Sequence, residues 1–249
     1  MHINIGESTY QVSKRLKMAV TLSVTGTESI LTVEYFPPIN LATDYVCGLI
    51  NFQTFNSIPN IDQKNNLLHF GNLIIKIPVG SYEIDDINEY VKDYLKINNH
   101  QNKAFLLKAN NNTLKSEIFS SESIDFDQDN SIGSVLGFQR EKLKPHYLHK
   151  SSLPVNIVKV NSIQIECNIV SGSFLNNKSV HTIHAFSPNV PPGYKINEVP
   201  RHVAYLPINS RRITSLTLKI TDQNGDLVNF RGEEITIRLH LIPRHVGVQ

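Results

Sequence analysis

The residues whose types and spacing come nearest to a chemical site are three alternate carboxylates, Asp125, Asp127 and Asp129. Alternate carboxylates are typical of calcium-binding loops, in which oxygen ligands surround the ion. An EF-hand loop also needs Gly at its sixth position and Glu at its twelfth, and this chain has Asn130 and Leu136 there. We therefore interpret the segment as an acidic surface turn and predict no metal site.

Three histidines, His181, His184 and His202, are a second candidate for metal binding. In an extended strand, a spacing of three places the side chains of the first two on opposite faces of the sheet, where they cannot share one ion. No Cys, Asp or Glu stands at ligand spacing from them. We expect ordinary strand histidines.

The segment Gly133–Gly137 resembles a nucleophile elbow, but that motif needs Ser midway between the glycines, and Ser134 comes one place early. The sequence contains neither a phosphate-binding glycine loop nor a dinucleotide fingerprint. A carbohydrate-active β-sandwich could use a pair of carboxylates, for which Glu117, Asp125 and Glu198 are candidates. Nothing in their spacing selects a pair, so we predict no catalytic residue, no cofactor and no enzyme.

The composition is that of a packed globular protein. The chain has 249 residues, of which 40% are hydrophobic and 18% charged, enough for one large β-domain or two smaller ones. The net charge of +2 gives no electrostatic reason to expect a nucleic-acid partner. A basic stretch, Arg140–Lys150, is interrupted by Glu141 and Pro145 and is interpreted as a solvated linker.

Cys47 and Cys167 are the only cysteines of the chain, and two thiols in a chain of this length do not make a disulfide framework. Whether they pair stays open. Residues Met1–Lys17 lack the apolar core of a signal peptide, and no apolar run approaches the ~18 residues that a membrane span needs. We expect a soluble protein made in a reducing compartment.

Hydrophobic alternation predicts most of the elements. Apolar residues occupy every second position in two segments near the C-terminus, and Asn224–Gly225 between them favours a tight turn. Other expected strands cover residues 20–24, 30–36, 45–55, 73–78, 105–108, 113–118, 155–160, 162–170, 180–186 and 202–206, with Pro37 and Pro38 expected to end one of them.

One segment, Tyr82–Lys96, carries its apolar residues at helical spacing, and Ser81 is expected to cap it. A single helical turn is expected in Ile132–Phe138. Strands on both sides of this α+β segment predict an all-β sandwich, residues 1–66 and 152–249, interrupted by an α+β insertion, residues 67–151. Two tandem domains are the alternative.

Three blocks of the sequence together resemble the minor capsid (penton) proteins of Maverick/Polinton elements and adintovirus-like viruses. The blocks are IPVGSYEIDDINEYV (Ile77–Val91), SIDFDQDNSIGSVLGF (Ser123–Phe138) and ITSLTLKITDQNGDLVNFRGEEITIRLHL (Ile213–Leu241), and the resemblance spans Leu31 to Leu241. It implies a single jelly roll with an insertion, a structural role without catalysis, and homopentamers at the vertices of an icosahedral capsid. It further implies a double jelly-roll major capsid protein as partner and a place in the virion, after assembly inside the cell.

A five-fold ring repeats one heterologous interface, so each subunit needs two different patches. The proline-rich segment, residues 187–200, is the expected contributor to one patch, with Tyr194 as a flat anchor. Arg201, Arg211 and Arg212 are expected to pair with carboxylates of a neighbouring subunit. Two alternatives remain: a surface loop without a partner, and, for the whole chain, a β-sandwich module whose insertion recognises a ligand or receptor.

Overall fold

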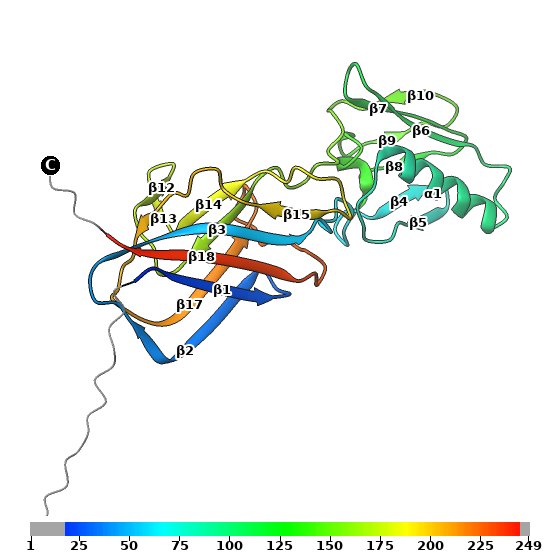
Figure 1. Cartoon of the computed structure of the whole chain (residues 1–249). Coiled ribbons are helices and arrows are strands. Elements are labelled where there is room, and N and C mark those ends of the chain that lie inside the picture. The colour runs from blue at the N-terminus through cyan, green and yellow to red at the C-terminus, as the bar shows by residue number, and fades with distance from the viewer. Residues whose placement is uncertain (1–17, 245–249) are drawn as a thin grey trace, which may run out of the picture.

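Two separate hydrophobic cores organise the computed structural model, which describes residues 18–244 (Figure 1). The first core fills a β-sandwich, and the second fills a smaller lobe inserted between two of the sandwich strands. The strands of the sandwich are β1 (Val20–Gly26), β2 (Ile30–Asn40), β3 (Tyr45–Phe55), β11 (Ile163–Cys167), β14 (Thr182–Phe186), β15 (Lys195–Glu198), β16 (Leu206–Pro207), β17 (Arg212–Thr221) and β18 (Ile235–Pro243).

These strands form two antiparallel sheets. The first sheet has the order β1-β18-β3-β15, with β16 also paired to β3, and the second has the order β14-β11-β17-β2. If β16 is left out, the sandwich has eight strands, which can be numbered 1 to 8 in chain order. The order across the first sheet is then 1-8-3-6, and the order across the second sheet is 5-4-7-2. This is the strand order of a jelly roll. The fold class predicted from the sequence is confirmed.

The inward-facing apolar side chains of the strands fill the space between the two sheets. Leu239 and Leu49, which are paired in the first sheet, are at most 1% exposed, and so are Ile165 and Ile220, which are paired in the second. Gln164, Lys219 and Arg238, which directly precede three of them, point away from the core and are more exposed. The side-chain period of two therefore places one face of each sheet in the core.

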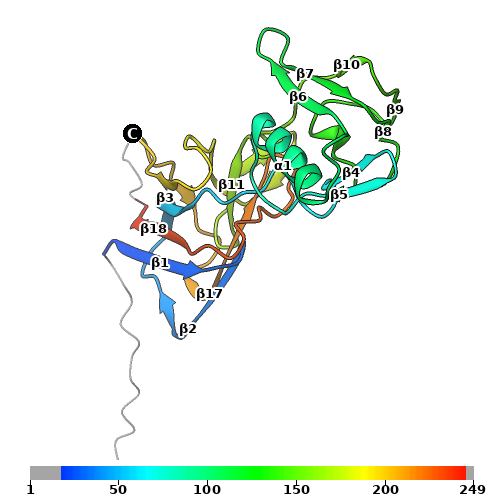
Figure 2. The same cartoon turned by 90° about the vertical axis from the view of Figure 1, so that its right-hand side faces the viewer.

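The insertion lobe consists of the elements between β3 and β11 that surround the second core. Figure 2 shows α1, the single α-helix of the described residues, beside the strands of this lobe. Its elements are β4 (Leu67–Phe70), β5 (Leu73–Lys76), α1 (Ile84–Ile97), β6 (Phe105–Asn110), β7 (Lys115–Ser120), β8 (Ile124–Asp125), the 3-10 turn η1 (Ile132–Ser134), β9 (Lys142–Leu143) and β10 (Leu148–Lys150). A hairpin of β12 (Ser173–Leu175) and β13 (Lys178–Val180) belongs to the sandwich side of the chain.

The core assignments bear on where the insertion begins and ends. Ile61 belongs to the second core and Ile157 packs against it, whereas Ile58 and Val160 pack against the first core. We propose that the insertion is a folding unit bounded by residues 59 and 158, somewhat wider than the expected 67–151.

Two expected strands differ from the structure. Residues 155–160 were expected to be a strand, but they cross from one lobe to the other without a ladder partner. Of the segment 202–206, only Leu206 enters a strand, β16. Ile157 and Val160 of the first segment pack against the cores from outside any sheet, whereas Leu206 packs against the sandwich core from within β16.

Pro37 and Pro38 do not end β2, which continues to Asn40. β2 is an edge strand, where a missing N–H leaves no ladder bond unmade, and its pairing with β17 shifts register between Ile213 and Ser215. The expected cap of α1 is also wrong. Glu83 is the N-cap residue, and the Ser81 hydroxyl donates to the carbonyl of Ile58, at 2.6 Å.

The turn at Asn224–Gly225 forms, with φ of +87° at Gly225, but the strands around it are not a hairpin. β17 lies in the second sheet and β18 in the first, so the connection crosses between the sheets. Alternation gives the buried face of each strand and leaves its neighbour undetermined.

Candidate interaction surfaces

The proline-rich segment is fastened to its own sandwich through Asn56. The backbone N–H of Asn56 donates to the carbonyl of Tyr194, at 2.8 Å, and Gly193 donates back to Asn56, at 2.7 Å. The side-chain amide of Asn56 donates to the carbonyl of Val190, also at 2.7 Å. The main chain is therefore held, while the Tyr194 side chain is 65% exposed and free to contact another molecule.

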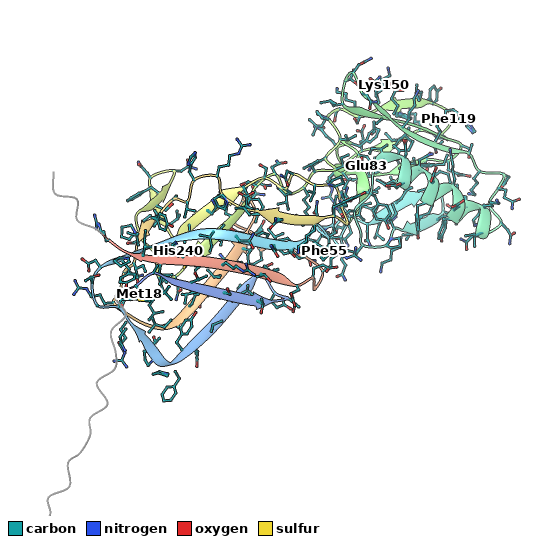
Figure 3. The ribbon with its side chains drawn as sticks, in the orientation of Figure 1. Met18, Phe55, Glu83, Phe119, Lys150 and His240 are labelled. Atoms are coloured by element: carbon teal, nitrogen blue, oxygen red, sulfur yellow. The ribbon has the colours of Figure 1, made fainter. Side chains whose placement is uncertain are left out.

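A cleft of about 490 Å³ lies where the sandwich meets the insertion lobe. Its walls come from the two crossing segments, the start of α1 and the proline-rich segment, and its lining residues include Ile58, Pro59, Tyr82, Val158 and Pro191. Figure 3 labels Phe55 on the sandwich side of this junction and Glu83 on the insertion side. Apolar walls with a few polar groups are typical of a small ligand site.

An ion pair between Lys159 and Asp62 joins the two crossing segments beside the cleft. Partial burial disfavours the charged carboxylate, but the hydrogen bonds from Lys159 and from the backbone of Lys64 outweigh it and lower the pKa of Asp62. At neutral pH the pair is therefore charged, and it helps to hold the crossing segments together.

The four residues expected at a subunit interface do not form one patch. Tyr194 precedes β15, whose first residue pairs with Phe55 at the end of β3. Arg211 binds Asp44, immediately before β3 begins, through Nε at 2.9 Å. β3 is 11 residues long, so these two sites lie roughly 30 Å apart along the sandwich. Figure 3 labels Met18, whose carbonyl accepts a hydrogen bond from the Tyr45 hydroxyl, at the end far from the insertion.

The partner of Arg211 within the chain is thus Asp44, and a second guanidinium nitrogen lies 2.8 Å from the same carboxylate oxygen. Arg212 is exposed at the start of β17, opposite Asn40. Arg201 is exposed in the connection from β15 to β16, on the same side of the sandwich as Tyr194.

The most exposed aromatic residue among residues 18–244 is not one of the interface residues expected from the sequence. Phe36, on β2, is 101% exposed, and it continues an outward row of alternate residues formed by Ile30, Thr32 and Glu34. The same alternation that identified the strand places Phe36 on the outward face. A large apolar side chain at an outward position of a strand suggests an interaction site, and the sequence pattern alone provides this information for Phe36.

Phe36 and Tyr194 lie at opposite lateral edges of the sandwich. β2 is the last strand of the second sheet and packs near β1, the last strand of the first sheet. At the other edge, β14 and β15 end their sheets and are joined by His184 and Glu198, whose Nε2 and Oε1 atoms are 2.9 Å apart. Val199, which follows β15, is 57% exposed at this second edge. Each edge thus presents an apolar side chain to solvent.

The residues weighed for chemistry have structural partners. Arg140 contacts Asp129, at 2.6 Å, and Asp127, at 3.5 Å, so these carboxylates face a guanidinium group. Within residues 18–244, no group of three or more His, Cys, Asp or Glu residues could hold a metal ion. Ser134 lies in η1, where Gly133 and Gly137 form a tight turn.

His181 and His184 have different partners, and the three carboxylates considered for glycoside hydrolysis lie on different elements. His181 Nδ1 contacts the carbonyl of Val170, at 2.6 Å, whereas His184 is bound to Glu198. Glu117 on β7 and Asp125 on β8 belong to the insertion lobe, and Glu198 ends β15 of the sandwich. The structure therefore does not assemble the three glycosidase candidates around one element.

No helix among the described residues is long and apolar enough to cross a membrane. The fold defines a jelly-roll protein with an insertion between its third and fourth strands. No family model matches the chain, and no curated protein matches it. Among solved structures, it is similar to the crystal structure of selenomethionine-labelled mavirus penton protein, with a TM-score of 0.46 and 9% identity over 90% of this chain and 98% of that one.

Proposed function

We propose that this chain is a structural capsid protein that forms homopentameric vertices of an icosahedral particle, with no catalytic activity. The observation that carries the proposal is the jelly-roll strand order with its single insertion, the architecture that the three sequence blocks imply. In this proposal the major capsid protein, a double jelly roll, surrounds each pentamer, and the chain resides in the virion after assembly inside the cell.

The two lateral edges supply the different patches that a ring requires. In a closed ring with one heterologous interface, one edge of each subunit meets the other edge of its neighbour. Phe36 lies at one edge, and Tyr194 and Val199 lie at the other. A fully exposed Phe exposes a large apolar area to water, and burial against a neighbour stabilises the assembly by roughly 25 cal/mol for each Å² covered.

The charges of the two edges are complementary. Glu34 is exposed beside Phe36, whereas Lys195 and Arg201 are exposed along the β15 edge. Opposite charges around an apolar contact steer association and fix its register more than they add affinity. Of the expected interface residues, Tyr194 and Arg201 fit this edge. Arg211 and Arg212 fit a contact at the far end of the sandwich.

The oligomeric mass of the purified chain tests the proposal. Light scattering and negative-stain images are expected to show pentameric rings. Phe36→Ser is expected to shift the mass to monomer and to leave the circular-dichroism spectrum of the folded chain unchanged, because the side chain has no contact to lose within one subunit. Tyr147→Ser, which removes a 63% exposed aromatic from the insertion lobe, is the matched control. A wild-type chain that remains monomeric at high concentration would refute the vertex role.

The junction cleft favours a second candidate, a β-sandwich module that binds a ligand or receptor at its insertion. Its apolar walls and its position between two lobes are typical of binding sites. A monomeric wild type whose melting temperature rises with a small apolar ligand, and whose Val158→Asp variant loses that rise, would favour this function over the vertex.

A further inference from the structure

Two buried thiols face each other from the opposite sheets of the sandwich. Cys47 lies on β3 of the first sheet and Cys167 ends β11 of the second, and both are 0% exposed members of the same core. Both side chains enter this core from facing sheets, and the largest influence on the pKa of each thiol is the other thiol, so the two side chains are neighbours within the sandwich.

The strand partners of the two thiols are apolar. Cys47 is paired with Leu241 and Leu206, and Cys167 is paired with Leu218. The two leucines paired in the long strands are 0% exposed. Both cysteines are free in this structure. Besides Cys47, the polar groups that act on the Cys167 thiol are the backbone N–H groups of Ile169 and Val170. In the described part of the chain, residues 18–244, no group of three or more His, Cys, Asp or Glu residues could hold a metal ion there.

We propose that Cys47 and Cys167 form an intrachain disulfide bond when the chain folds in the presence of a low-molecular-weight disulfide such as glutathione disulfide. One thiol, after loss of its proton, attacks glutathione disulfide and releases one glutathione. The second thiol, also deprotonated, attacks the mixed disulfide and releases the second glutathione. Two electrons pass from the protein to the oxidant, and the two thiol protons balance the two released thiolates.

The reaction belongs to the folding stage. The hydrogen bond to Cys167, followed by burial, raises the pKa of the Cys47 thiol, so the folded chain supplies little thiolate at this position, and the oxidant has no access to a 0% exposed sulfur. Before the core closes, both thiols are accessible and have ordinary reactivity. A chain folded under reducing conditions is therefore expected to keep both thiols.

The bond would tie the two sheets together and close a loop that contains the whole insertion lobe. Closing a loop of about 120 residues (167 − 47) restricts the unfolded chain strongly, so the melting temperature is expected to rise by roughly 10 °C. This inference does not depend on the capsid proposal, since it concerns the core of one sandwich.

The test is to refold the reduced, denatured full chain in glutathione buffers of graded oxidised-to-reduced ratio. Intact mass spectrometry is expected to show the loss of two hydrogen atoms from the monomer, thiol titration in denaturant to show no free thiol, and calorimetry to show the higher melting temperature. The C47A/C167A variant is expected to melt at one temperature in every buffer. Two titratable thiols, stable glutathione adducts or intermolecular dimers in the most oxidised buffer would each overturn the proposal, and the wild-type mass decides even if the variant fails to fold.

Discussion

At the residue scale, Gly137 holds the turn after η1 in a conformation that only glycine fits. Its φ is +78°, and a Cβ at this position would lie 2.8 Å from the carbonyl oxygen of Pro154. Its own carbonyl accepts a hydrogen bond from Leu153, at 3.0 Å, so the segment after β10 cannot move away without losing that bond. Because the atoms nearest to the added Cβ are backbone atoms, no flexible side chain can move aside to relieve the clash.

Gly137→Ala is therefore expected to destabilise the insertion lobe by about 3 kcal/mol. Gly193→Ala is the matched control, because φ is +83° there and nothing lies within 4 Å of the added carbon. It should lose about 1 kcal/mol, the strain of a positive φ alone. Urea unfolding of both variants measures the difference, and equal losses would contradict the proposed clash.

A second residue-scale prediction concerns Glu117, a carboxylate with two lysines. Its pKa is lowered, first by the hydrogen bond from Lys108 and then by that from Asn110, with Lys150 also contributing. A carboxyl whose pKa is lower in the folded than in the unfolded state stabilises the fold above its unfolded pKa, and this stabilisation disappears as the pH falls toward the folded pKa.

Glu117→Gln is thus expected to lower the stability of the insertion lobe at pH 7 and to converge with wild type as the pH falls below the ordinary carboxylate range. Denaturant unfolding of both proteins between pH 7 and pH 3 measures the two curves. Glu89→Gln, at an exposed position of α1, should show a pH dependence like that of wild type. A constant gap between Glu117→Gln and wild type at every pH would mean that packing, not charge, is lost.

At the element scale, α1 begins with a reciprocal pair of caps. The carboxylate of Asp86 accepts the backbone N–H of Glu83, at 2.8 Å, and the Glu83 side chain accepts the N–H of Asp86 in return. These bonds satisfy donors that the helix itself cannot pair.

Asp86→Ala is expected to lower the stability of the insertion lobe by about 1 kcal/mol, the usual loss for a cap. Asp85→Ala removes the same charge from the same turn without removing the cap and should lose only a few tenths of that amount. Thermal unfolding of the two variants compares them directly. Equal melting temperatures would show that the charge at the helix start, not the hydrogen bond, is what matters.

The elements also show what the sequence can predict. β3 has the bounds expected from its β-branched and aromatic run, Tyr45–Phe55. α1 departs from its expected range by two residues at its start and by one at its end. The continuation of β2 through Pro37 could not be predicted, because it depends on β2 being an edge strand. The placement of β17 and β18 in different sheets could not be predicted either. Each strand has the same alternation of apolar residues whether it pairs with the other or with a different strand.

The residues expected at a subunit interface show that the sequence pattern does not predict which distant residues lie on the same edge of the sandwich. An aromatic residue in a proline-rich loop predicts an exposed anchor at Tyr194, and the structure leaves this side chain exposed. Arg211 is near Tyr194 in sequence, yet the jelly-roll connections place it at the other end of β3, beside Asp44. The outward position of Phe36 is predictable from the alternation of β2. Strand order determines which residues lie on the same edge of the sandwich, and the local sequence pattern does not predict strand order.

At the scale of the whole molecule, the insertion lobe is connected to the sandwich by two crossing segments that lie side by side. The side chain of Asn60 in the first segment donates to the carbonyl of Ile157 in the second, at 3.1 Å. A short linker can therefore replace everything between them. The loop it closes is far shorter than the one it removes, so closure does not oppose folding of the sandwich.

We expect a variant with residues 60–157 replaced by Gly-Ser-Gly to fold and to form pentamers. The sandwich keeps its own core, and both lateral edges, with Phe36 and Tyr194, belong to it. Light scattering and calorimetry of the shortened chain measure mass and stability together, and Phe36→Ser in the same background should again give monomers. A folded but monomeric shortened chain beside a pentameric full chain would place the ring contacts in the insertion lobe and exclude the lateral-edge interface.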